Sequence, residues 1–164
     1  HAAHERIVYE NIKEKYWKNE SIAQFLAAPV VVELTHQELK FAEDKKDFLE
    51  KLGFTIESFG SNSVIIRSIP YFTDSTDAKE IFLEAVDSTF NTWKSGIEKS
   101  ADTAIYTVAC KAAVKANKRL DGLEIKNILR EMDKLENPFT CPHGRPSIIR
   151  ITRYELEKMF KRVV

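Results

Sequence analysis

The spacing of apolar residues along the chain predicts six helices. Residues 1–20 place apolar side chains on one helical face, and residues 101–117 do so mainly with small side chains that allow close packing. We expect the second of these to be the most buried helix. Four more helices are marked by capping boxes, in which Thr or Asp is followed three residues later by Glu. These boxes start helices over 36–52, 77–93, 121–136 and 153–162, and Gly53 suits the left-handed position after the first.

Runs of β-branched and aromatic residues predict four strands, over 30–34, 54–59, 63–69 and 148–151. Gly60-Ser61-Asn62 predicts a short hairpin between the middle two. Strand, helix, strand, strand and helix follow one another across residues 29–93, as in a small α/β unit inserted between two outer segments. The predicted fold class is therefore α+β with two lobes, an outer one formed by both chain ends and an inserted external one.

Composition describes a well-folded chain and excludes some partners. Its 164 residues are 43% hydrophobic and 30% charged with only five glycines, which leaves little room for long flexible linkers. The 25 basic residues balance 25 acidic ones, so contacts with nucleic acid would be local or helped by a partner. No apolar run approaches the ~18 residues needed to span a membrane. The chain begins at His1 rather than Met, and we expect it to be a fragment.

The clearest chemical signal is Cys141-Pro142-His143, where two metal-ligand residues lie two positions apart. Pro138, Pro142 and Pro146 brace this loop and keep it from being helical. Thiolate and imidazole are common zinc ligands, although a purely structural turn remains an equal alternative. A disulfide between the two cysteines of the chain is the less favoured reading, because the compact chain suits a reduced intracellular setting.

Further candidate ligands lie on two of the predicted helices. His1 and Glu5 are four residues apart and share one helical face with His4, whereas Glu10 falls well round the helix and would serve a second metal or support the ligands. Cys110 lies in the alanine-rich helix. A solvated helix face and a small buried hydrophobe are the plain alternatives for these positions. Together with the loop, the set of nitrogen, oxygen and sulfur ligands suits zinc or manganese.

Several motifs together resemble a known family. His1-Ala2-Ala3-His4-Glu5 with Glu10 is similar to the latter part of a DQHAxxExxxxE motif, Ala109-Cys110-Lys111 to ACR, Cys141 to Pro146 to CPHGRP, and Phe160-Lys161-Arg162 to FxR. The chain thus resembles the C-terminal domain of MutL-type DNA mismatch-repair proteins, in the branch with endonuclease activity. The Asp-Gln that opens the first of these motifs is absent from the chain, and Lys111 takes the place of the arginine of the ACR motif.

The resemblance implies a metal-dependent endonuclease that nicks DNA in mismatch repair as a homodimer stimulated by the replication sliding clamp. It implies Zn²⁺ and/or Mn²⁺ and no nucleotide in this domain. The implied roles are catalysis for His1, Glu5 and Glu10; metal binding for His1, Glu5, Cys110, Cys141 and His143; and DNA contact for Arg145 and Lys111. A mismatch-recognition protein would be reached through the full-length protein, and the location would be the cytoplasm, at the nucleoid, in a bacterium.

The resemblance also implies an internal division of labour. Residues 1–20 plus 106–164 would form the dimerisation subdomain with the metal site, and residues 21–105 an external regulatory subdomain. Gln24, Phe25, Leu26 and Pro29 lie in a segment similar to the family's sliding-clamp docking motif, with a plain linker as the alternative. Two other functions stay open: a dimerisation and partner-recruitment module that zinc braces without catalysis, and a regulatory domain that only recruits proteins.

Overall fold

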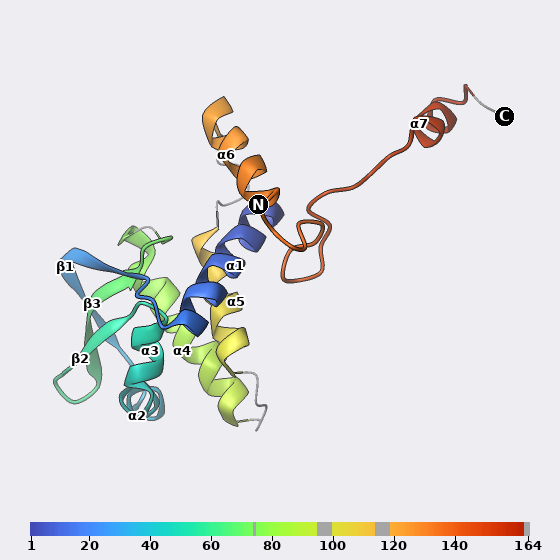
Figure 1. Ribbon diagram of the computed structural model, residues 1–164. Coiled ribbons are helices and arrows are strands. Elements are labelled where there is room, and N and C mark those ends of the chain that lie inside the picture. The colour runs from blue at the N-terminus through green and yellow to red at the C-terminus, as the bar shows by residue number, and fades with distance from the viewer. Residues whose placement is uncertain (74, 95–99, 114–118, 163–164) are drawn as a thin grey trace.

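The computed structural model describes residues 1–73, 75–94, 100–113 and 119–162. Figure 1 shows helices packed beside a small sheet, and a C-terminal segment that reaches away from this body. The mixture of helices with a small antiparallel sheet confirms the predicted α+β class.

Three long helices form the centre of the body. They are α1 (Ala2–Lys18), α4 (Ala78–Lys94) and α5 (Ser100–Ala112), and α5 packs against both of the others. Ala104, Ile105, Val108 and Ala109 of α5 are fully buried, as the prediction of a deeply buried helix required. Small side chains at two of these positions let neighbouring helices approach closely. This packing brings the first residues of the chain next to α5.

A three-stranded antiparallel sheet lies beside the helices, in the order β1-β3-β2. The strands are β1 (Ala23–Glu33), β2 (Thr55–Phe59) and β3 (Ser63–Pro70), and the predicted hairpin joins the last two. β1 begins earlier than the hydrophobic run predicted. Its register against β3 shifts between Phe25 and Val30, so the segment 26–29 bulges out of the ladder.

The helix predicted over 36–52 is two helices, α2 (His36–Asp44) and α3 (Lys46–Lys51). Lys45 separates them with φ −114° and ψ 25°, outside helical geometry, and no glycine or proline marks this break in the sequence. Gly53 follows with φ +93°, which confirms its predicted left-handed position. A Cβ at Gly53 would come within 3.0 Å of the Pro70 backbone, so the sheet approaches this turn closely.

The structure confirms the predicted capping boxes at Thr35, Asp121 and Thr152. The fourth position, Asp77, ends a short 3-10 turn η1 (Ser75–Asp77) that leads into α4.

Buried residues from α1, the sheet, α4 and α5 form one continuous hydrophobic cluster. The division into two lobes stays a prediction. None of the described helices is long and apolar enough to cross a membrane.

The C-terminal part contains α6 (Gly122–Met132), α7 (Arg153–Met159) and a long loop between them. The strand predicted over 148–151 is wrong, because these residues pair with no strand among those described.

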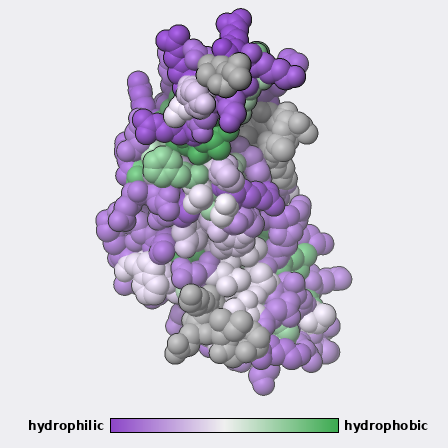
Figure 2. Space-filling view, turned by 90° about the vertical axis from the view of Figure 1, so that its right-hand side faces the viewer, coloured by the Kyte–Doolittle hydropathy of each residue, from purple (hydrophilic) through white to green (hydrophobic). Residues whose placement is uncertain are grey.

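Residues 147–162, here called the arm, extend away from the body (Figure 1). The arm exposes Ile148, Ile149, Ile151, Tyr154, Leu156, Met159 and Phe160. Figure 2 looks at the side to which the arm projects, and green apolar side chains gather in its upper part on a largely hydrophilic face.

Candidate metal centre

Three segments far apart in the sequence meet at one point of the body. Glu5 lies on the first turns of α1 and is 2% exposed, which is unusual for a carboxylate. Cys110 lies near the end of α5, and His143 comes from the loop after α6. The packing of α1 on α5 brings the first two together, and the loop folds back so that its histidine joins them.

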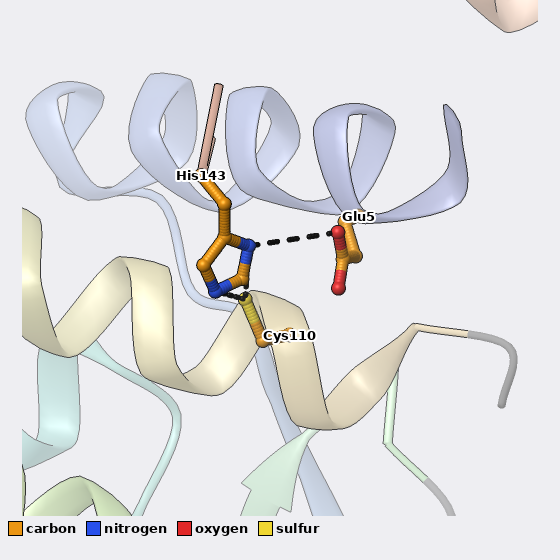
Figure 3. A group of neighbouring side chains, drawn as sticks. All are labelled: Glu5, Cys110 and His143. Atoms are coloured by element: carbon orange, nitrogen blue, oxygen red, sulfur yellow. Dashed lines mark hydrogen bonds and ion pairs between the residues drawn. The ribbon is translucent and has the colours of Figure 1, made fainter. Parts of the chain in front are cut away.

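The three side chains point toward one another (Figure 3). The Nδ1 atom of His143 lies 3.7 Å from Oε2 of Glu5, and the Sγ atom of Cys110 lies 3.8 Å from either ring nitrogen of His143. One ligand atom from each residue falls within 4.8 Å of the other two. Ligands held at about 2.0–2.3 Å around a tetrahedral zinc ion stand roughly 3.3–3.8 Å apart. The separations of His143 from Glu5 and from Cys110 therefore fit ligands that share one metal ion.

The electrostatics of the group also suit a bound cation. Oε2 of Glu5 is buried and has no hydrogen-bond partner among the described residues. A buried carboxylate oxygen without a partner carries a large desolvation cost, which a bound cation would offset. Burial raises the pKa of the Cys110 thiol to about 12, and the negative charges of Glu5 and Cys141 add to this rise. Nearby Arg145 lowers it only in part.

The remaining predicted ligands flank this group. His1 forms an ion pair with Glu5, with Nε2 2.9 Å from Oε1. Cys141 is buried, and its Sγ lies 3.8 Å from Nδ1 of His143, although it does not join the set of three mutually close residues. Both cysteines are free thiols, so the disulfide alternative is wrong for this structure. Glu10 lies outside the group and pairs with Arg6 at 2.9 Å.

The residues predicted to contact DNA differ in their surroundings. Arg145 is exposed in the loop beside the metal group. The Nζ of Lys111 lies 3.0 Å from Glu80 and 2.6 Å from Glu84, so two carboxylates of α4 already offset its charge.

The segment predicted to dock a sliding clamp lies in the edge strand β1 and its bulge, not in a linker. Phe25 is 74% exposed there, and Gln24 and Pro29 are exposed as well.

Two residues at the site were absent from the prediction. The ring of Tyr106 on α5 lies 4.3 Å from the ring of His143 in an edge-on arrangement. Arg6 binds the backbone of the loop at Thr140. The four-residue spacing of Arg6 and Glu10 was visible as a helical ion pair, but nothing in the sequence tied either residue to a loop more than a hundred positions away.

Comparison with known proteins gives the family to which the chain belongs. The sequence model of the MutL C terminal dimerisation domain matches residues 1–120. The chain belongs to this family of dimerisation domains, as its motifs predicted.

Individual relatives give the same result over almost the whole chain. The DNA mismatch repair protein MutL of Clostridium botulinum (strain Loch Maree / Type A3) is 39% identical over 163 residues, which is 99% of this chain and 24% of that protein. The protein of the same name from Thermoanaerobacter pseudethanolicus is 41% identical over 166 residues, covering 100% of this chain and 26% of that protein. The chain thus spans about a quarter of the length of these relatives.

Proposed function

We propose that the chain is a metal-dependent endonuclease domain that nicks DNA during mismatch repair, as part of a homodimeric protein. The observation that carries this proposal is the convergence of Glu5, Cys110 and His143 around a buried carboxylate oxygen that has no hydrogen-bond partner among the described residues. Membership of the dimerisation-domain family and relatives named as mismatch-repair proteins support the assembly and the pathway. The cofactor would be Zn²⁺ and/or Mn²⁺.

The side chains around such a metal would have two roles, binding the metal and binding the DNA. Glu5, Cys110 and His143 would hold it, with Cys141 and His1 as further ligands from either side. A bound divalent metal would make water a better nucleophile and stabilise charge on a phosphodiester. Arg145, exposed beside the group, would bind a DNA phosphate through two parallel hydrogen bonds. The equal number of acidic and basic residues makes intrinsic DNA binding weak and sensitive to salt.

The test is nicking of supercoiled plasmid by the full-length protein with Mn²⁺ and Zn²⁺ supplied. Glu5→Gln should abolish nicking and lower metal content, because it removes the charge that the cation neutralises. Glu14→Gln is the matched control, since Glu14 lies on the same helix but is exposed and pairs only with Lys18 at 2.6 Å. Equal nicking by the Glu5 variant would reject the proposal. The molar mass by light scattering must stay that of the parent protein.

Exposed β1 supports a proposed second partner, the replication sliding clamp. Gln24, Phe25 and Pro29 are exposed on an edge strand whose register against β3 shifts between Phe25 and Val30. An exposed aromatic side chain on an unpaired strand edge is suited to docking in a pocket of another protein. Stimulation by the clamp would bring the weakly binding domain onto DNA.

A second candidate is a dimerisation and partner-recruitment module in which zinc only braces the fold. It is favoured by the thiols of Cys110 and Cys141, which both approach His143 to 3.8 Å. Four protein ligands would close the coordination sphere and leave no position for water. Metal analysis separates the two candidates: tightly bound zinc with no nicking under any metal or clamp condition would establish the bracing role.

A further inference from the structure

The loop that carries His143 has little regular structure to fix it in place. A single bridge pairs Thr140 with Pro146, and inside it Gly144 N donates to Cys141 O at 2.9 Å while Cys141 N donates to Arg145 O at 2.8 Å. These bonds shape the turn but do not attach it to the body. Contacts with α1 and α5 must therefore set where the imidazole and thiol of this turn lie, and His143 makes such contacts with Glu5, Cys110 and Tyr106.

Arg6 supplies a further contact, at the start of the turn. Its Nε donates to the carbonyl oxygen of Thr140 at 2.6 Å, and its Nη2 lies 3.4 Å from the Thr140 hydroxyl. The other side of the guanidinium is held by Glu10, with Nη1 2.9 Å from Oε1, and the Tyr9 ring lies 5.7 Å from its central carbon. The Arg6 side chain is only 13% exposed. All three nitrogens of one planar group are thus engaged at once.

The positions of Arg6 and Thr140 in the sequence indicate what this contact does. Arg6 directly follows Glu5, and Thr140 directly precedes Cys141. The hydrogen bond between Arg6 and Thr140 therefore connects the backbone next to Glu5 with the backbone next to Cys141. A hollow of about 440 Å³ lies beside it, lined by Arg6, Tyr9, Asp102, Thr103, Tyr106 and Pro142. The bonds of Arg6 therefore hold the Thr140 end of the turn beside this hollow, while the buried Cys141 and the ring contact of Tyr106 with His143 pack the rest of it.

We propose that Arg6 is a positioning residue, anchored by Glu10, which fastens the Thr140–His143 turn to α1 and so sets the geometry of the metal group. We call this arrangement the Arg6 bracket. The inference rests on the proposed metal site but does not require that the site be catalytic. It gives Glu10 the role of orienting the guanidinium, in place of binding a second metal.

The first test is zinc affinity of the full-length protein, measured by competition with a chelator. Arg6→Ala should weaken zinc binding on the order of tenfold to a hundredfold, as expected when a group that orients ligands is lost. Arg6→Lys should rescue little, because an ammonium cannot reach Thr140 and Glu10 with a fixed fork. Arg67→Ala is the matched control, since Arg67 binds Glu57 through bonds of 3.0 and 2.8 Å on the sheet. It should leave zinc affinity unchanged.

The second test needs no metal. Cys141 is 1% exposed, so its reaction with a disulfide reagent in metal-free protein should be slow, and Arg6→Ala should speed it several-fold while Arg67→Ala does not. Circular dichroism must show that each variant is folded. If Arg6→Ala does not fold, Arg6→Lys takes its place in both tests. Unchanged zinc affinity in a folded Arg6 variant would overturn the bracket. If the parent protein binds no zinc, the proposed metal function fails, and the reactivity of Cys141 alone decides the bracket.

Discussion

The thiol of Cys110 is kept protonated by its surroundings. Burial is the main reason that its pKa is raised, and electrostatic interactions with Glu5 and Cys141 raise this pKa further. Only a thiolate binds a metal or attacks an alkylating reagent. A metal arriving at the group would therefore displace a proton from Cys110, and uptake of metal would be coupled to pH.

We predict that alkylation of Cys110 in the metal-free protein keeps accelerating up to pH 10. The reason is that its pKa is raised from 9.0 to about 12, so the reactive thiolate is still a minor form at that pH. In urea-unfolded protein the rate should level off above pH 9. Mass spectrometry of the modified peptides resolves Cys110 from Cys141. A plateau near pH 9 in the folded protein would contradict the prediction.

Gly53 and Gly60 form a natural comparison of backbone strain. Both have positive φ, +93° and +70°, but a Cβ would come within 3.0 Å of backbone only at Gly53. Gly53→Ala should lower the free energy of unfolding by about 1–3 kcal/mol, and Gly60→Ala by less, because only the first adds a steric clash to the left-handed conformation. Urea unfolding of both variants tests this. Equal losses would show that the approach of Pro70 does not matter.

At the level of elements, the sequence predicted the features that depend on neighbouring residues. It did not predict those that depend on pairing with a distant segment. The boxes at Thr35, Asp121 and Thr152 are set by residues three apart, so the sequence predicted those helix starts correctly. The strand at 148–151 was wrong because a β-branched run becomes a strand only beside a partner. The break at Lys45 carries no local signal.

The same limit applies to the site. The ligand types of Glu5, Cys110 and His143 could be recognised from sequence, and the structure brings these three together. The Arg6 bracket could not be predicted, since it depends on how the loop after α6 returns to α1. The roles assigned to Arg145 and Lys111 stay predictions.

The edge strand β1 allows a prediction about the sliding clamp. Phe25→Ala should weaken binding of the clamp at least tenfold, because the side chain is the largest exposed anchor of the segment, and should leave zinc content unchanged. Phe59→Ala is the control, an exposed phenylalanine on β2, at the other edge of the sheet. Surface plasmon resonance with immobilised clamp measures both. Equal weakening by the two variants would reject a specific role for the β1 segment.

At the level of the whole molecule, many of the exposed apolar side chains lie in the C-terminal part of the chain. The arm and α6 together expose many apolar side chains, among them Ile149 at 71% and Leu123 at 72%. Exposed apolar side chains in such number are normally covered by protein. The family of dimerisation domains to which the chain belongs supports self-association as the reason.

We therefore predict that Ile149→Asp combined with Met159→Asp shifts the full-length protein from dimer toward monomer. The carboxylates would be desolvated in any interface that buries the arm, at a cost that weakens association by at least tenfold. Light scattering across a dilution series measures the shift. Phe59→Asp, on the sheet, should leave the molar mass unchanged, and a stable dimer in the double variant would exclude the arm from the interface.

The three residues of the metal group come from the beginning, the middle and the end of the chain. A cation held by all three would close the polypeptide into large loops, much as a covalent cross-link does, and an unfolded chain could keep that closure only at a large entropic cost. Binding to the native form alone would also add stability in proportion to the logarithm of free metal concentration. The fraction of this domain that is folded in a cell would then rise and fall with the supply of metal.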